Sequence, residues 1–216
     1  MIKTTVVIAD DHPIVAMAVQ EIIERDERFE VVGLASGPTE LVQLHQALSP
    51  DVVIADYNMP GDDTYGDGLQ MIEYLCRHFS DTRILVFTML SNPLILGSLY
   101  DLGVWGVILK SGDFNEIALA LRALSKGRKY RPAPLIPADP GTPGEQQVQA
   151  RIARLTVREY EVLRHFVSGL SGREVAALLH RSTKTVSAQK VSAMRKLGVE
   201  NDQALLAFCA DTHLFL

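Results

Sequence analysis

The chain has 216 residues, enough for one or two domains with a substantial hydrophobic core. Hydrophobic residues make up 47% of the chain and charged residues 22%, and no run approaches the ~18–20 apolar residues of a membrane-spanning helix. No signal peptide is visible, and Cys76 and Cys209 lie far apart in helical patterns, so we expect a cytoplasmic protein without a disulfide.

The net charge of −5 hides an asymmetry between the two parts of the chain. Residues 1–150 carry 11 Lys and Arg against 20 Asp and Glu, a balance of −9, whereas residues 151–216 carry 10 against 6, a balance of +4. An acidic front and a basic back predict that only residues 151–216 meet a polyanion.

Strand and helix patterns alternate along residues 1–126. Short apolar runs predict strands at Thr5–Ala9, Glu30–Leu34, Val52–Asp56, Ile84–Thr88 and Val107–Leu109. The runs at Thr5–Ala9 and Val52–Asp56 are of the kind that is buried on both faces of a parallel sheet. Apolar residues at helical spacing predict helices between them, at Ile14–Glu24, Thr39–Leu48, Leu69–Phe79, Leu94–Leu102 and Asn115–Ser125. Five such units predict an α/β domain with a five-stranded, doubly wound parallel sheet.

Polar residues stand at the carboxyl ends of four of these strands: Asp10 and Asp11, Asp56, Thr88, and Lys110. In a parallel sheet these ends share one edge, where open α/β sheets bind ligands. Neighbouring carboxylates repel one another and therefore predict a bound cation. Oxygen ligands suit Mg²⁺, with a backbone carbonyl near Asn58 as a further ligand.

The same residues predict a site for a phosphoryl group. Asp56 is expected to be the nucleophile that attacks phosphorus, while Lys110 and Thr88 stabilise the phosphoryl oxygens by charge and by a hydrogen bond. Each residue alone has a structural explanation, since a Thr or a Lys at a strand end is usually a cap or a solvated charge. Five suitable residues at the ends of four strands favour the functional interpretation.

The helical periodicity stops after residue 126. Half of the chain's ten prolines fall within residues 127–150, which predicts an extended linker between a domain at 1–126 and a second domain at 151–216.

Four short helices are predicted in residues 151–216, which makes the second domain small and all-α. Two capping boxes, in which Thr or Ser is followed three residues later by Glu, open the first two helices. These boxes are Thr156 with Glu159 and Ser171 with Glu174. The helices are expected at Val157–Val167, Arg173–Leu179, Thr183–Leu197 and, capped by Asn201 or Asp202, up to about Thr212.

The helix at Thr183–Leu197 has one apolar face and one mostly polar face. If about residues 171–190 form a helix-turn-helix, this helix is its second helix and its polar face would enter the DNA major groove. Lys and Arg would bind phosphates, small residues would permit close approach to the bases, and Gln189 would read adenine if it reaches the groove. An ordinary solvated helix face is the alternative. The candidate DNA contacts are Lys184, Thr185, Ser187, Ala188, Gln189, Lys190, Val191 and Arg195.

These motifs resemble known families. The sequences ADDHP from Ala9, DYNMPG from Asp56, Thr88, and Leu109-Lys110 are similar to the receiver domain of two-component response regulators. The sequences LTVRE from Leu155, KTV from Lys184 and RKLGV from Arg195 are similar to the LuxR/NarL-type helix-turn-helix. The chain is thus identified as a member of the NarL/FixJ-type response regulators. DDHPIV from Asp10, YGDG from Tyr65, Asn92-Pro93 and KLGVEND from Lys196 are similar to the Rcs branch of that family.

The resemblance implies a phosphorylation-controlled transcription regulator. A sensor histidine kinase or a histidine phosphotransfer protein would phosphorylate Asp56, and Asp10, Asp11, Asp56 and Asn58 would hold Mg²⁺. The protein would bind promoter DNA as a homodimer, or as a heterodimer with an auxiliary regulator.

Three features depart from the receiver pattern. The loop at residues 61–68 is longer and more acidic than in most receivers, which would alter partner docking. Met89 replaces the small residue that usually follows Thr88, so we expect it to shield the phosphorylated aspartate from water. Val107 stands where many receivers have a Tyr or Phe that changes rotamer, so that switch cannot operate from this position.

Two alternative functions compete with this interpretation. A phosphatase with an aspartyl-phosphate needs a second acid to protonate the leaving group, but Tyr57 and Asn58 follow Asp56 and no Asp-x-Asp is present, so an enzyme is not expected. The other alternative is a regulator that acts without phosphorylation, through heterodimerisation.

Overall fold

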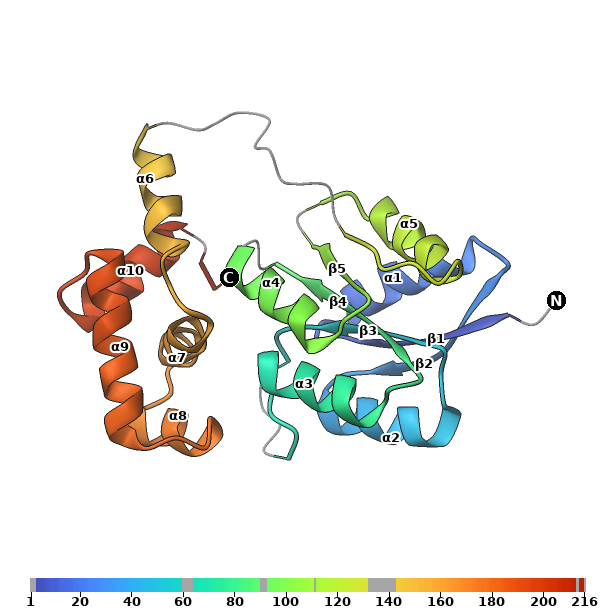
Figure 1. The fold of residues 1–216 in the computed structure, drawn as a ribbon, viewed down its shortest axis with the longest axis horizontal. Helices are drawn as coiled ribbons and strands as arrows, with labels where there is room; N and C mark the ends of the chain where they lie inside the picture. The colour runs from blue at the N-terminus through green and yellow to red at the C-terminus, as the bar shows by residue number, and fades with distance from the viewer. Residues whose placement is uncertain are drawn as a thin grey trace. The chain divides into compact units, whose positions relative to one another are not determined.

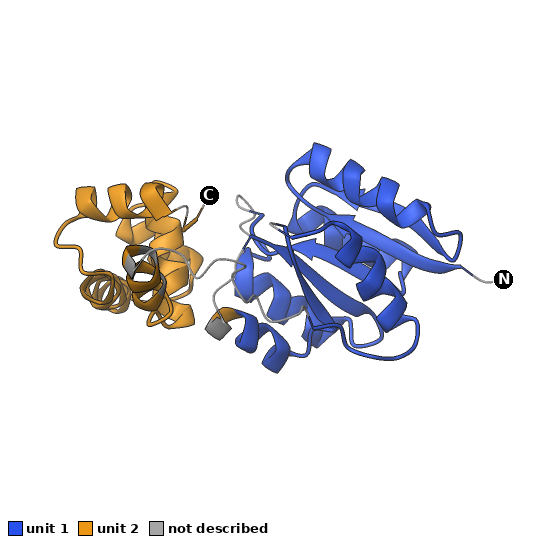
Figure 2. Ribbon diagram, turned by 90° about the horizontal axis from the view of Figure 1, so that it is seen from above, with its two compact units in different colours: residues 1–91, 96–134 blue, residues 92–95, 135–216 orange. Residues whose placement is uncertain are grey.

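The computed structural model describes residues 3–59, 64–89, 93–110, 112–131, 143–212 and 214–215. The chain divides into two compact units, residues 1–91 with 96–134 and residues 92–95 with 135–216 (Figure 2). Residues 132–142 of the predicted linker, residues 61–63 of the acidic loop and Asn92 lie outside the described residues.

The first unit contains a five-stranded parallel sheet in the order β2-β1-β3-β4-β5 (Figure 1). The predicted sheet is confirmed, and each strand agrees with its predicted bounds to within one residue. The strands are β1 (Thr4–Ala9), β2 (Phe29–Ala35), β3 (Val52–Asp56), β4 (Arg83–Thr88) and β5 (Gly106–Leu109). The continuous apolar runs of β1, β3, β4 and β5 follow from the helices that cover both faces of the sheet, whereas the edge strand β2 is exposed at Glu30 and Leu34.

Four helices connect the strands and a fifth follows β5, and the five divide between the two faces of the sheet. Helices α1 and α5 lie together on one face, and α2, α3 and α4 lie on the other (Figure 1). Their bounds are α1 (Pro13–Glu24), α2 (Pro38–Leu48), α3 (Gly68–His78), α4 (Pro93–Leu102) and α5 (Asn115–Leu124).

Alternate strand residues build the two halves of this core, because successive side chains point to opposite faces of a sheet. Ile8, Ile54 and Phe87 pack with the apolar residues of α1 and α5. Their neighbours along the strands, such as Val7 and Val53, are equally buried and point to the face of α2, α3 and α4. The sheet is therefore held rigidly, and so are the residues at its carboxyl edge.

The edge strand β5 begins with Gly106 because the Leu85 side chain and the backbone of Tyr130 lie too close to leave room for a Cβ atom. A Cβ atom at Gly106 would lie 2.7 Å from Leu85 Cδ2 and 3.1 Å from the carbonyl oxygen of Tyr130. Tyr130 donates its backbone N–H to the carbonyl of Trp105 (2.8 Å), so the segment after α5 lies against the start of β5.

The second unit is helical and confirms the four helices predicted in residues 151–216, with α8 beginning and ending one residue earlier. It consists of α6 (Pro143–Ile152), α7 (Val157–Val167), α8 (Gly172–Leu178), α9 (Thr183–Leu197) and α10 (Asp202–Thr212). Both predicted capping boxes are present at the starts of α7 and α8. Asn201 caps α10, accepting a hydrogen bond from the N–H of Ala204 (2.8 Å).

Helix α6 is a departure from the sequence expectation. Its first eight residues fall in the segment expected to be extended, and that expectation is wrong for residues 143–150. Pro143 occupies the first helical position, where its missing N–H costs little, and the residues after Gly144 are mostly good helix formers.

Helices α7, α8 and α9 enclose a small core of their own. Val162, Val175, Ala176 and Val186 are its buried members.

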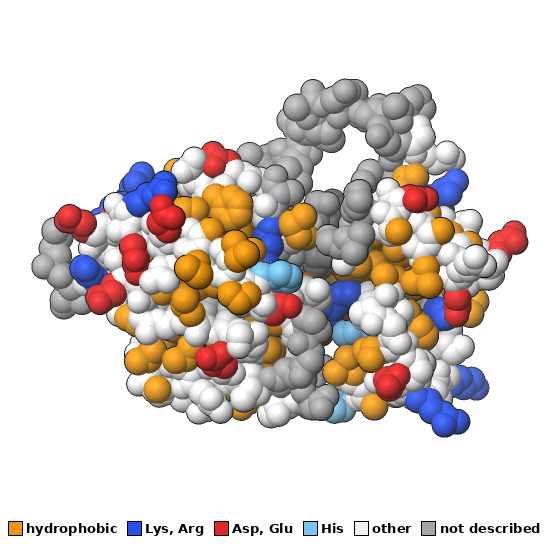
Figure 3. Space-filling view, turned by 180° about the vertical axis from the view of Figure 1, so that it is seen from behind, with side chains coloured by type: hydrophobic (Ala, Val, Ile, Leu, Met, Phe, Trp, Pro, Cys, Tyr) orange, Lys and Arg blue, Asp and Glu red, His pale blue; other side chains and the backbone are white. Residues whose placement is uncertain are grey.

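The two cysteines are free, as expected. Acidic and basic side chains are interspersed among apolar ones on the face drawn in Figure 3. Among the described residues, no helix has the length and apolar character needed to cross a bilayer.

Candidate functional site

The carboxyl edge of the sheet brings together residues from four strands. The ammonium of Lys110, which follows β5, lies 2.7 Å from Asp10 Oδ2 and 2.9 Å from Asp56 Oδ2. The backbone N–H of Lys110 donates to the carbonyl of Thr88 (2.8 Å), so β4 and β5 are in register at this edge. Residues that are far apart in the sequence therefore form one cluster because the strands are parallel.

Burial governs the electrostatics of this cluster. The side chains of Asp10, Asp56 and Lys110 are 1%, 7% and 12% exposed. Burial raises the pKa of Asp56 to about 6, although the opposing charge of Lys110 lowers it. Burial by itself lowers the pKa of Lys110, but the carboxylates of Asp56 and Asp10 outweigh that effect and raise it. The neighbouring carboxylates therefore stabilise the charged form of Lys110. The buried carboxylate of Asp56 would be stabilised in its ionised form by further positive charge.

Asp11 and His12 lie beside the carboxylates of Asp10 and Asp56. Ligand atoms of Asp10, Asp11, His12 and Asp56 all lie within 4.8 Å of one another. His12 donates its backbone N–H to Asp10 Oδ1 (2.9 Å), and its ring Nδ1 lies 2.7 Å from Asp11 Oδ1. The sequence analysis did not single out His12, although its place directly after the two acids was the available signal.

Asn58 lies two residues after Asp56, Thr88 ends β4, and Met89 directly follows it. The backbone N–H of Asn58 donates to Asp56 Oδ1 (3.2 Å), while Thr88 is 1% exposed at the end of β4. Met89 is 53% exposed, so its side chain borders solvent directly after β4.

Tyr100 is a further residue that the sequence analysis missed. Its hydroxyl accepts a hydrogen bond from the backbone N–H of Val107 (3.2 Å) and donates to the carbonyl of Tyr130 (2.8 Å). The guanidinium of Arg131 lies 4.3 Å from the centre of its ring. Val107 itself is fully buried. A tyrosine from α4 therefore ties β5 to the segment that leaves the first unit.

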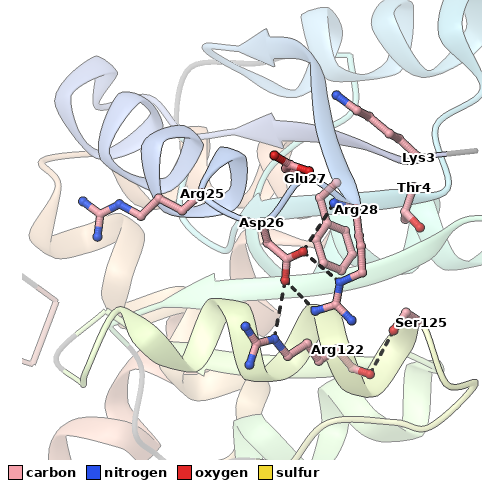
Figure 4. A pocket seen from close by; sticks show the side chains of 9 residues that line it. Lys3, Thr4, Arg25, Asp26, Glu27, Arg28, Arg122 and Ser125 are labelled. Carbon is pink, nitrogen blue, oxygen red and sulfur yellow. Dashed lines mark hydrogen bonds and ion pairs between the residues drawn. The ribbon is translucent and has the colours of Figure 1, made fainter. Parts of the chain in front are cut away.

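A cleft of about 1050 Å³ lies at the opposite edge of the sheet, where β1 and β2 begin (Figure 4). Its basic residues are largely neutralised within the protein. Asp26 accepts hydrogen bonds from the Arg28 guanidinium (2.8 and 2.5 Å) and lies 3.5 Å from Arg122. The bonds from Arg28 hold the pKa of Asp26 well below its usual range. We therefore assign no ligand to this cleft.

The outward face of α9 forms the second candidate site. Six of the eight predicted DNA contacts are exposed, and five of these follow the helical spacing of a single stripe. The exposed residues are Lys184, Thr185, Ser187, Ala188, Val191 and Arg195.

The other two predicted contacts are held within the second unit. The Lys190 ammonium lies 2.7 Å from Asp202 Oδ2 and 4.1 Å from the centre of the Phe166 ring. Gln189 Oε1 accepts a hydrogen bond from Arg181 (3.3 Å). These contacts favour structural roles for Lys190 and Gln189.

Glu159 holds α9 against α7. Its carboxylate accepts hydrogen bonds from Lys196 (2.6 Å), Ser192 (2.7 Å) and the backbone N–H of Thr156 (2.7 Å). Burial by itself raises the pKa of Glu159, but Lys196, Thr156 and Ser192 outweigh it and lower the pKa to about 2. The sequence analysis identified Glu159 only as a capping residue.

Replacing Glu159 should destabilise the second unit. Because its pKa falls from 4.5 to about 2 on folding, the carboxylate stabilises the fold above pH 4.5, and this contribution is lost as the pH falls towards 2. Glu159→Gln should lower the free energy of unfolding at pH 7 by about 2–3 kcal/mol. Hydrogen exchange of the α7 and α9 amides would measure the loss, which should shrink below pH 4.5.

The matched control is Glu174→Gln, since Glu174 caps α8 in the same way but lies exposed. Its loss should be clearly smaller than that of Glu159→Gln. Equal losses for the two variants would show that capping alone, without Lys196 and Ser192, accounts for the effect.

Two family models match the chain. The response regulator receiver domain matches residues 6–122, and the bacterial regulatory proteins of the luxR family match residues 153–209. Among curated proteins, the chain is 42% identical to transcriptional regulatory protein RcsB of Escherichia coli K12, covering 99% of this chain and 97% of the relative. It is 30% identical to transcriptional regulatory protein LiaR of Bacillus subtilis, over 97% of this chain and 98% of the relative.

Solved structures of RcsB are similar over nearly the whole chain. The structure of RcsB from Salmonella enterica serovar Typhimurium bound to promoter rprA in the presence of the phosphomimetic BeF3⁻ has a TM-score of 0.79 and 41% identity. The match covers 96% of this chain and 99% of that one. A structure of two RcsB dimers bound to two parallel DNAs has a TM-score of 0.76 and 41% identity, with 95% and 98% covered.

Proposed function

The chain belongs to the response regulators with a receiver domain followed by a LuxR-family domain, and from this premise we propose that phosphorylation of Asp56 controls its binding to promoter DNA. The observation that supports the proposal most strongly is the Lys110 ammonium, which contacts Asp10 and Asp56 at the sheet edge. The test is whether a phosphoryl donor changes DNA affinity through Asp56.

Asp56 is the proposed phosphoacceptor. A bond would form between an Asp56 oxygen and phosphorus while the bond from phosphorus to the donor's imidazole nitrogen breaks, with the electron pair leaving on the imidazole. The donor would be a sensor histidine kinase or a histidine phosphotransfer protein. The carboxylate must be ionised to attack, and the neighbouring Lys110 favours that form.

The acidic cluster fits Mg²⁺, because Asp10, Asp11 and Asp56 offer carboxylate oxygens within one coordination shell. When bound, Mg²⁺ supplies positive charge against the phosphoryl oxygens. Asn58, which already donates its N–H to Asp56, would contribute its backbone carbonyl. His12 would keep Asp11 oriented through its ring nitrogen.

Lys110 and Thr88 would sense the product. Phosphorylation adds a charge of about −1.5 to −2. The Lys110 ammonium, 2.9 Å from Asp56, would bind the new oxygens, and Thr88 would donate its hydroxyl to them. Thr88 ends β4 and Lys110 directly follows β5, and both strands are buried in the core. A shift of either residue would therefore bias the loops that follow β4 and β5.

The exposed face of α9 is the proposed DNA-reading surface. Lys184 and Arg195 would bind phosphates, and Thr185, Ser187, Ala188 and Val191 would approach the bases. Lys190 and Gln189, the other two predicted contacts, would reach DNA only by leaving the side chains of the second unit that hold them.

Assembly and organisation complete the proposal. We propose a receiver domain at 1–126, a linker at 127–150 and a DNA-binding domain at 151–216. We propose that the protein acts in the cytoplasm as a homodimer whose two α9 helices meet successive half-sites. A heterodimer with an auxiliary regulator is the alternative.

Met89 should prolong the life of the phosphoryl group. Its side chain borders solvent directly after Thr88, where it would slow the entry of water. Met89→Ala is expected to speed dephosphorylation roughly twofold to tenfold. A dephosphorylation time course in Mg²⁺ would measure this, and equal rates for the variant and the wild type would contradict the shielding role.

A further inference from the structure

The four cations of α9 divide into two pairs. Lys190 and Lys196 are bound within the unit, at 2.7 Å from Asp202 and 2.6 Å from Glu159. Lys184 and Arg195 are exposed at either end of the outward stripe. The middle of that stripe therefore carries no charge.

The middle also lacks most hydrogen-bonding groups. It consists of Ser187, Ala188 and Val191, and only Ser187 has a polar side-chain group. Ser192, which is adjacent in sequence, donates its hydroxyl to Glu159 (2.7 Å). A surface of this kind cannot make the bidentate contacts that identify guanine or adenine.

Val191 is the unusual member of the stripe. Its side chain is 62% exposed, although valine is a weaker helix former than alanine or lysine and gains nothing from water. It borders a shallow depression of about 410 Å³ that Met194 and Val199 also line. One cation and one anion, Arg195 and Glu200, also line the depression, and their charges balance.

We propose that Val191, together with Ala188, binds the C5-methyl group of thymine, so that the base pair facing the middle of α9 is A·T. The inference deepens the proposed DNA-binding function and rests on it. Apolar contact with this methyl is the means by which aliphatic side chains distinguish thymine in the major groove. The flanking cations favour DNA over a partner protein, since Lys184 and Arg195 lie ~10 Å and ~6 Å along the helix from Val191.

The test removes one methyl group at a time. DNA would be selected from a random pool with the full-length protein activated by beryllofluoride and Mg²⁺. Each thymine of the selected site would then be replaced by deoxyuridine, which keeps Watson–Crick pairing. At one position per half-site the wild type should lose roughly threefold to tenfold in affinity, as expected for one methyl group. Val191→Ala should reduce this difference between the thymine and uracil sites to less than about twofold, because only Ala188 is left to contact the methyl group.

Leu206→Ala is the matched control, because Leu206 is an apolar side chain on α10 with 48% exposure. It should keep the wild-type ratio between thymine and uracil DNA. Binding without any effect of uracil, or an unchanged ratio in Val191→Ala, would overturn the thymine contact alone and would point to a protein partner for Val191. Failure to bind any DNA would overturn the proposed function as well.

Discussion

An Asp56→Asn variant is expected to take up less than about one hundredth of the phosphoryl group that the wild type accepts from acetyl phosphate. The reason is that an amide cannot act as the nucleophile, while Asp10 and Lys110 keep their mutual contact of 2.7 Å and cannot replace it. Phosphoryl incorporation in Mg²⁺, followed by mass spectrometry, would measure the loss. Labelling of the variant at the wild-type level would show that another residue is the acceptor.

The loss should not reflect unfolding. Folding raises the pKa of Asp56 from 3.8 to about 6, so the ionised carboxylate destabilises the fold, and the penalty grows as the pH rises through this window. Asp56→Asn should therefore increase the free energy of unfolding without Mg²⁺ at pH 7.5 by about 1–3 kcal/mol. The two unfolding curves should approach each other near pH 4. Asp81→Asn, at an exposed turn position before β4, should change neither labelling nor stability.

A double variant, Lys184→Gln with Arg195→Gln, is expected to weaken DNA binding on the order of 10- to 100-fold at physiological salt. Both side chains are exposed on the outward face of α9, where they can reach phosphates. The slope of log K against log salt should become shallower by about 0.9 for each lost phosphate contact, or about 1.8 per protomer. Binding titrations at four salt concentrations would give this slope.

Lys190→Gln provides the comparison for this experiment. It removes the same charge from the same helix, but its ammonium is held by Asp202 and Phe166. The salt slope should stay as in the wild type, while the stability of the second unit falls. If Lys190→Gln made the salt slope shallower by about 0.9, as expected for one lost phosphate contact, Lys190 would bind DNA as the exposed cations do. That result would contradict the division of the α9 cations into a bound pair and an exposed pair.

The strands and the cluster at their ends were accessible from the sequence because both depend on local pattern and topology. Continuous apolar runs mark buried parallel strands, and parallel strands bring residues such as Asp10, Asp56 and Lys110 to one edge regardless of their separation along the chain. The capping boxes of α7 and α8 are likewise local patterns, and the structure confirms both.

The contacts that the sequence did not reveal are tertiary. Helical spacing places Lys190 at the border of the outward face. The tertiary structure brings Asp202 and Phe166 next to its ammonium, so that Lys190 binds within the second unit. The Tyr100 hydroxyl forms hydrogen bonds with the backbone of Val107 and Tyr130. The pattern of side-chain types along the sequence does not predict such bonds to the backbone. Helix α6 was missed because it begins with Pro143 and Gly144 and follows a segment that is rich in proline.

The central claim is that the phosphoryl group on Asp56 controls DNA binding. The most direct measurement is the dissociation constant of the full chain for a selected DNA site, with and without acetyl phosphate in Mg²⁺, for the wild type and for Asp56→Asn. We predict that the donor tightens binding of the wild type about tenfold or more, a change of about 1.4 kcal/mol, and leaves the variant unchanged. Equal affinity of the phosphorylated and unphosphorylated wild type would contradict the account.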